Sequence, residues 1–188
     1  DDNNCVVTDD ITINEPNQFD LTFSQTDIVC FGDCNGDATV TMNSGGTPAY
    51  NYQWDDPLLQ TTPTAIGLCA GPVTVTVTDQ NLCDTIISYN ILEPLEIVID
   101  TNVIISSCFG SCSGQAYITA VGGTGAYTFE WFDAITGLPL GVNNDSITNL
   151  CPGDYYAQIT DAALCQVNSD TMTITELPEI FTQVITEG

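Results

Sequence analysis

The chain contains no lysine, no arginine and no histidine. Against these absences stand 25 acidic residues, so the 188-residue chain has a formal net charge of −25. Nucleic acids and anionic membrane surfaces are bound through basic side chains, so neither is an expected partner. Side-chain salt bridges and lysine–asparagine cross-links are excluded for the same reason. A charge of this size keeps a chain soluble through self-repulsion and requires cations in the medium.

The same absences bear on catalysis. Without histidine, lysine or arginine, the remaining acid–base groups are carboxylates and tyrosines. A pair of carboxylates could serve a glycosidase, but such enzymes need a cleft that very small domains seldom provide. The sequence therefore predicts that the protein is not an enzyme. No apolar run approaches the length of a transmembrane helix.

The sequence does contain an internal repeat, with two similar copies between Cys30 and Pro178. Both copies carry, in one order, Cys-Phe-Gly, Gly-Gly-Thr-x-Ala-Tyr, Trp, Leu-Cys-x-Gly, Thr-Asp, Leu-Cys and a Glu followed by Pro. The matching positions include Cys30 and Cys108, Cys34 and Cys112, Trp54 and Trp131, Cys69 and Cys151, Asp79 and Asp161, and Cys83 and Cys165. A period near 80 residues suits a small all-β module.

The repeat predicts how the chain divides. Residues 17–94 and 95–178 are expected to be two complete modules. Residues 1–16 match the C-terminal strands of a preceding module, and residues 179–188 match the first strand of a following one. Such a chain could form one continuous array, or successive copies could complete each other's modules by exchanging strands.

Period-two alternation predicts strands throughout, and no helical period is evident. The clearest predicted strands span residues 38–42, 73–77, 86–91, 116–120, 156–160 and 171–174. About seven short strands in 80 residues predict an all-β fold, with tandem immunoglobulin-like β-sandwich modules. Tyr50, Tyr52 and Trp54 lie on one strand face, as do Tyr127, Phe129 and Trp131. These aromatic side chains could bind sugar rings, but burial in the core is the favoured interpretation.

Nine cysteines place four in each module and leave Cys5 over. Modules of this size often need disulfides, and disulfides persist in an oxidising, extracytoplasmic environment. Four cysteines could instead bind zinc, but the spacing from Cys69 to Cys83 is far from that of a zinc ribbon. Disulfides are therefore expected.

The ordered set of motifs resembles the SprB-type repeat of giant gliding adhesins of Bacteroidota. The resemblance implies a secreted cell-surface adhesin, exported by type IX secretion and associated with gliding motility. The familiar repeat has two cysteines, which match Cys30 and Cys83, and Cys108 and Cys165. If these are bonded, the predicted bridges are Cys30–Cys83, Cys34–Cys69, Cys108–Cys165 and Cys112–Cys151. A scheme joining near neighbours, Cys30–Cys34 and Cys69–Cys83, stays open. Cys5 is expected to pair with a residue outside the chain.

Two weaker candidate sites complete the analysis. Asp33, Asn35 and Asp37 have the alternating oxygen ligands of a calcium loop, but the second copy lacks the carboxylates. No cofactor is expected, only calcium or other cations bound diffusely. Asp-Ser/Thr-apolar triplets at Thr85, Ser146 and Thr171 resemble the O-glycosylation acceptor of exported Bacteroidota proteins, so the chain could be a glycoprotein.

The predicted function is the structural shaft of an extracellular, cell-surface adhesin or filament. Its partners would be neighbouring modules or copies of itself. The alternative is that the modules themselves bind polysaccharide or a solid surface; the longer loop 132–140 would be the first place to look for recognition.

Overall fold

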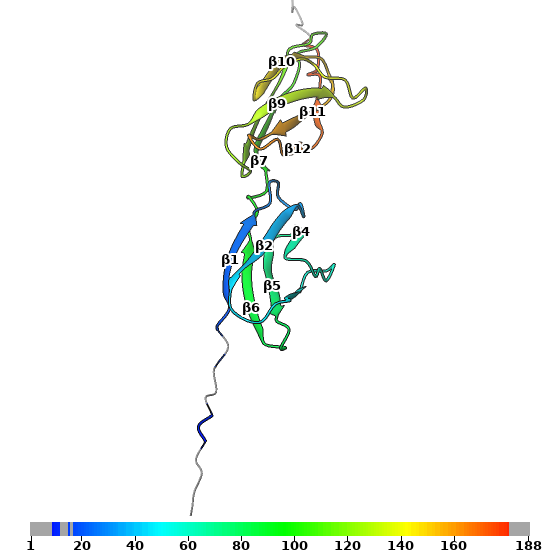
Figure 1. Cartoon of the computed structure of the whole chain (residues 1–188). Coiled ribbons are helices and arrows are strands. Elements are labelled where there is room, and N and C mark those ends of the chain that lie inside the picture. Colours follow the sequence, from blue (N-terminus) through cyan, green and yellow to red (C-terminus); the bar gives the residue numbers. More distant parts are fainter. Residues whose placement is uncertain (1–8, 12–14, 16, 181–188) are drawn as a thin grey trace, which may run out of the picture. The chain divides into compact units, whose positions relative to one another are not determined.

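The computed structural model describes residues 9–11, 15 and 17–180 (Figure 1). The chain divides into two compact units, which are described separately. Unit 1 comprises Asp1–Thr26 and Gly36–Ile91, and unit 2 comprises Asp27–Asn35 and Leu92–Gly188. The short segment Asp27–Asn35 thus interrupts unit 1 in the sequence but folds as part of unit 2. The predicted module boundaries at residues 94 and 178 stay a prediction.

Unit 1 is built from two three-stranded antiparallel sheets (Figure 1). The first sheet has the order β1-β2-β4 and contains β1 (Asp20–Thr26), β2 (Gly36–Ser44) and β4 (Thr64–Leu68). The second sheet has the order β3-β5-β6 and contains β3 (Asn51–Trp54), β5 (Gly71–Thr78) and β6 (Asp84–Ile91). If these strands are named A, B, C, E, F and G along the chain, the sheets are A-B-E and C-F-G, which is the immunoglobulin arrangement without strand D.

Alternation explains how unit 1 forms its core. Every second residue of β5 is buried, with Val75 and Val77 at 0% exposure, while the threonines between them are partly exposed. Trp54 on β3 is also fully buried, and its indole Nε1–H donates to the carbonyl oxygen of Thr62 at 2.8 Å. A buried tryptophan on the third strand is a hallmark of this sandwich.

Unit 2 repeats the plan. One sheet, of order β10-β8-β7, contains β7 (Val98–Ile105), β8 (Gly114–Val121) and β10 (Ser146–Leu150). The other centres on β11 (Gly153–Thr160), which pairs with β9 (Thr128–Asp133), β12 (Gln166–Asn168) and β13 (Met172–Ile174). Side chains from both sheets form one core, including Ile118, Trp131, Ala157 and Met172. The sheets therefore pack face to face.

The predicted fold class is confirmed: the described chain is all-β, carries disulfides and shows the tandem immunoglobulin-like arrangement. The predicted segments in both modules lie in β2, β5, β6, β8, β11 and β13, except Thr171, which precedes β13. The described residues contain no helix long and apolar enough to span a membrane.

A glycine pair fixes the turn that follows the second strand of each unit. Gly122 has φ +87°, and a Cβ atom there would lie 1.8 Å from the carbonyl oxygen of Glu96. Gly45 in unit 1 has φ +89° and the same conflict with Gln18 at 2.0 Å. Only glycine permits this close approach, which explains why Gly-Gly-Thr occurs in both copies.

Candidate functional site

The repeated Thr-Asp motif builds the same buried turn in both units. Asp161 follows β11 and is only 3% exposed. Its carboxylate accepts backbone N–H bonds from Thr124 at 2.7 Å, Ala163 at 2.9 Å and Cys165 at 2.9 Å. The backbone also closes on itself, because the N–H of Asp161 donates to the carbonyl oxygen of Cys165 at 3.0 Å. We call residues 161–165 and their counterpart 79–83 the Asp–Cys turns.

The Asp–Cys turn of unit 1 has matching geometry. Asp79 accepts backbone N–H bonds from Thr47 at 2.8 Å, Asn81 at 2.9 Å and Cys83 at 2.9 Å. Leu82 has φ 65° and its counterpart Leu164 has φ 68°. These contacts show that the Asp of each copy ends a strand and holds a turn.

The environment of these carboxylates acts on their pKa in two opposing directions. Burial alone would raise the pKa of the Asp161 carboxyl, but backbone donors from Thr124, Cys165 and Ala163 outweigh it and hold the pKa below the ordinary value. The pKa of Asp79 is lowered in the same way, against burial, by donors from Thr47, Cys83 and Asn81. Backbone donors therefore favour the ionised form of both carboxylates, which anchor the turns.

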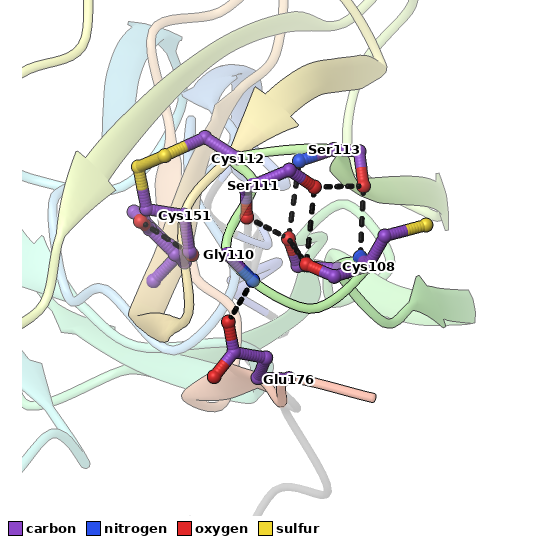
Figure 2. Close-up of a disulfide and its surroundings, with 9 residues drawn as sticks. Cys108, Gly110, Ser111, Cys112, Ser113, Cys151 and Glu176 are labelled. Atoms are coloured by element: carbon purple, nitrogen blue, oxygen red, sulfur yellow. Dashed lines mark hydrogen bonds between the residues drawn. A yellow bond between two sulfur atoms is a disulfide. The ribbon is translucent and has the colours of Figure 1, made fainter. Parts of the chain in front are cut away.

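A second repeated loop lies at the opposite end of the strands, at the Cys-Phe-Gly motif. Each copy forms a tight turn: the N–H of Asp33 donates to the carbonyl oxygen of Cys30, and that of Ser111 to Cys108, both at 3.1 Å. We call residues 30–34 and 108–112 the Cys-Phe-Gly turns. In the second copy the N–H of Gly110 donates to the Glu176 carboxylate (Figure 2). The equivalent bond joins Gly32 to Glu93 at 2.8 Å. The Glu of the Glu-Pro motif thus fastens the Cys-Phe-Gly turn, a role that the sequence did not reveal.

The disulfides are only partly those expected. Cys112 and Cys151 are bonded as predicted, across 39 residues (Figure 2). Cys34 and Cys69 are each disulfide-bonded; their predicted pairing with each other stays a prediction. Cys30, however, is bonded to Cys165, with a Cα–Cα distance of 5.5 Å.

The predicted Cys30–Cys83 and Cys108–Cys165 bridges are therefore wrong. Among the described residues, Cys83 and Cys108 are exposed and carry free thiols. The physical reason is strand length. In unit 2 the eight-residue strand β11 separates the end that carries Cys108 from the end that carries Cys165. At about 3.3 Å per residue this is more than 20 Å, and bonded cysteines need Cα atoms within about 7 Å.

The same pairing excludes the near-neighbour scheme. Cys30 is bonded to Cys165, so it is not bonded to Cys34, and Cys83 has no bond to Cys69. Cys5 lies outside the described residues.

The aromatic runs are mainly core, as the favoured interpretation predicted. Trp131 is fully buried, and its indole Nε1–H donates to the carbonyl oxygen of Asn144 at 2.8 Å. The Tyr50 hydroxyl donates to the carbonyl oxygen of Gly45 at 2.7 Å, and the Tyr127 hydroxyl to that of Gly122. The tyrosines therefore brace the glycine turns and do not form a flat exposed sugar platform.

The remaining candidates are separate surface positions. Among the described residues no three His, Cys, Asp or Glu side chains are placed to hold a metal ion. The Asn35 side-chain amide instead donates to the Asp33 carboxylate at 3.4 Å, while Asp37 lies in β2. Of the three glycosylation candidates, Thr171 is exposed, and Thr85 and Ser146 are half-buried.

Comparison with solved structures finds distant likenesses. A C-terminal fragment of intimin, solved with the intimin-binding domain of the translocated intimin receptor, is 14% identical with a TM-score of 0.42; 86% of this chain and 64% of that chain are covered. Extracellular domains 3–5 of Drosophila OTK are also 14% identical with a TM-score of 0.42, covering 85% and 62%. This chain therefore spans less than two thirds of the length of either.

Murine CEACAM1b is 13% identical, with a TM-score of 0.32 and coverage of 84% of this chain and all of that one. A search of curated proteins finds no match. Comparison with protein-family models gives a more specific match than the comparison with solved structures. The SprB repeat matches residues 22–59 and 106–134, so the chain carries SprB repeat sequence in both of its copies.

Proposed function

We propose that this chain is part of the structural shaft of a secreted cell-surface adhesin or extracellular filament. The SprB repeat and the disulfides indicate an extracellular or cell-surface protein of adhesin type. The observation that carries the shaft role is the form of the repetition. Most buried strand positions and the turn anchors match between the two units, whereas the exposed loops differ.

The loops after the third strand illustrate this contrast. In unit 2, Asp133 accepts backbone N–H bonds from Ile135 at 3.0 Å and Thr136 at 2.7 Å. In unit 1 the loop is organised by Asp56, which is 5% exposed and accepts backbone N–H bonds from Leu58 at 3.0 Å and Gln60 at 2.9 Å. A shared binding site would keep its exposed residues, whereas a shaft needs only a common core and common ends.

Single-molecule stretching of the whole chain between two handles tests this proposal. A shaft module should unfold cooperatively and release less length than its residue count allows, because bonded loops cannot extend. The Cys112–Cys151 bridge alone closes a 39-residue loop, which withholds about 140 Å at about 3.5 Å per residue. Adding reductant should restore that length. Extension without cooperative unfolding steps would contradict a load-bearing role.

A second candidate function is direct binding of polysaccharide through the loop 132–140. Ile135 is 81% exposed and Leu138 is 64% exposed, beside a stacked pair formed by Phe132 and Tyr156 with ring centroids 4.9 Å apart. If this surface binds, replacing Ile135→Asp and Leu138→Asp should abolish adsorption of the chain to polysaccharide-coated beads. The matched control is Leu58→Asp and Leu59→Asp in the corresponding loop of unit 1. Equal adsorption of both variants would argue against this alternative.

O-glycosylation at Thr85, Ser146 or Thr171 also belongs to this proposal. A bulky sugar on an exposed strand edge would protect an extracellular shaft and block edge-to-edge pairing. Intact mass of native material above the sequence value, in sugar-sized steps, would support it.

A further inference from the structure

The Cys30–Cys165 bond joins the two copies of the repeat. Cys30 belongs to the Cys-Phe-Gly turn of the first copy, and Cys165 to the Asp–Cys turn of the second. The bonded arrangement is well packed: Cys165 is 9% exposed, and Cys30 lies against the core of unit 2. A bridge between these two motifs is thus a linkage from one copy to the next, not a staple inside one copy.

The two free thiols occupy the matching motifs. Cys108 is in the Cys-Phe-Gly turn of the second copy, and Cys83 is in the Asp–Cys turn of the first. Each free cysteine occupies the same repeat position as a bonded cysteine: Cys108 corresponds to Cys30, and Cys83 corresponds to Cys165. Among the described residues, neither is bonded as its counterpart is.

The Asp–Cys turns present their cysteines in one conformation. The N–H of Cys83 donates to Asp79 Oδ1 at 2.9 Å, and that of Cys165 donates to Asp161 Oδ1, also at 2.9 Å. The return bonds to the cysteine carbonyls are 2.9 and 3.0 Å. Cys83 is nevertheless exposed and Cys165 is buried. The segment Asp27–Asn35 contacts Cys165, because the Cys165 sulfur lies 3.4 Å from the Val29 carbonyl oxygen, and it carries the bonded partner Cys30.

The two Cys-Phe-Gly turns also share one backbone conformation. Gly32 has φ 78° and Gly110 has φ 66°, and each turn is fastened by a glutamate. In Figure 2 the Cys108 sulfur points away from the Cys112–Cys151 bridge, and the Cys108 residue is exposed. Phe109 beside it is 54% exposed, close to the 49% of Phe31. The thiol is therefore held in place and accessible.

We infer that Cys108 of one chain forms a disulfide with Cys83 of a second copy, which reproduces between chains the Cys30–Cys165 linkage. By thiol–disulfide exchange with a small disulfide such as oxidised glutathione, the two thiols become one S–S bond. The glutathione disulfide is reduced to two glutathione thiols, which take up the two protons. Because the two ends differ, the contact is head-to-tail and can continue into a covalent filament.

This inference goes beyond the shaft role, since such a bridge could form whether or not the modules bear load. Its test uses the whole chain with Cys5→Ser throughout, so that this cysteine cannot contribute. One variant adds Cys83→Ser and keeps Cys108; the other adds Cys108→Ser and keeps Cys83. Each is incubated alone, and then both together, in a glutathione redox buffer with enough salt to screen the acidic surfaces.

The expected result is asymmetric. Each variant alone should stay monomeric, and the mixture should give a reductant-sensitive heterodimer whose bridging peptides contain Cys83 and Cys108. The chain that keeps both thiols should form a ladder of multimers. Random collision of equivalent thiols would give heterodimer and each homodimer at about 2:1, so a specific junction should exceed this ratio roughly tenfold.

A thiol placed elsewhere gives the matched control. Ser88→Cys on β6, combined with Cys83→Ser and Cys108→Ser, offers an exposed thiol without the Asp–Cys turn. Mixed with the variant that keeps Cys108, it should form heterodimer only at the random ratio. Homodimers as abundant as in random pairing, or heterodimer no greater than with the Ser88→Cys chain, would overturn the inference.

Discussion

At the scale of single residues, the buried aspartates govern how stability depends on pH. The folded-state pKa of Asp161 lies below its ordinary value, because backbone donors outweigh burial. A carboxyl whose pKa is lowered on folding adds stability above its unfolded pKa, near 3.9, and loses it as the pH falls through the folded value.

The corresponding prediction concerns Asp161→Asn. At pH 7 the variant should melt several degrees below the parent chain, because the neutral amide accepts more weakly and places a donor among N–H groups. Below about pH 4 the gap between the two melting temperatures should narrow, since the carboxyl of the unfolded parent is protonated there and that of the folded parent follows as the pH falls through its lower pKa. Thermal melting from pH 2 to pH 7 checks this. Asp145→Asn, at an exposed position, is the control; a gap independent of pH would contradict the assignment.

The glycine turns allow an equally local prediction. Gly122→Ala should destabilise unit 2 by about 1–3 kcal/mol, because the new Cβ meets backbone as well as an unfavourable φ. Gly110→Ala separates these effects: its φ is +66°, but nothing lies within 4 Å of the added Cβ. The free energy of unfolding from denaturant titration should fall more for Gly122→Ala. Equal losses would mean that backbone strain, not the contact with Glu96, sets the cost.

At the scale of elements, the strands were predictable and the bridges only in part, since Cys112–Cys151 is bonded as predicted but Cys30 is bonded to Cys165. Alternation identified β5 and β11 because one face of each is buried and the other is solvated. Short strands such as β4 and β10 lack that signal, since each is only five residues long. Periodicity predicts which face of a strand is buried, but it does not predict which of the turns that carry cysteines lie next to each other.

The predicted fold alone was enough to reject the Cys30–Cys83 disulfide. In an immunoglobulin-like sandwich the turn after the first strand and the turn after the fifth lie at opposite ends. Cys30 and Cys83 occupy those two turns, so they could not have been bonded within one module. The partner of Cys30 could not be read from the sequence, because cysteine spacing alone does not determine which cysteines are bonded.

The Cys112–Cys151 bridge supports the next prediction. It ties the Cys-Phe-Gly turn to the end of β10, closing a 39-residue loop. Replacing both cysteines, Cys112→Ala with Cys151→Ala, should lower the stability of unit 2 by about 4 kcal/mol in the chain-entropy model. Denaturant unfolding followed by the fluorescence of Trp131 measures this, with Trp54→Phe in both chains so that unit 1 is silent. An unchanged midpoint would show that strand pairing alone holds this end together.

At the scale of the whole molecule, electrostatic repulsion acts without any opposing side-chain charge. The formal charge is −25 with no cationic side chain, so folding brings carboxylates together that the unfolded chain keeps apart. The screening length falls from about 30 Å at 0.01 M salt to about 3 Å at 1 M. Stability should therefore rise with sodium chloride over that range, most steeply at the low end.

The identity of the cation then distinguishes diffuse binding from a specific site. No three His, Cys, Asp or Glu side chains of the described residues are placed to hold a metal ion, so calcium and magnesium should raise the melting temperature equally at matched ionic strength. Both should exceed sodium, because divalent ions accumulate more strongly at a dense negative surface. Differential scanning calorimetry in the three chloride salts gives the comparison. A gain unique to calcium and saturable at low concentration would instead require an oxygen-ligand site, with Asp33, Asn35 and Asp37 the first residues to replace.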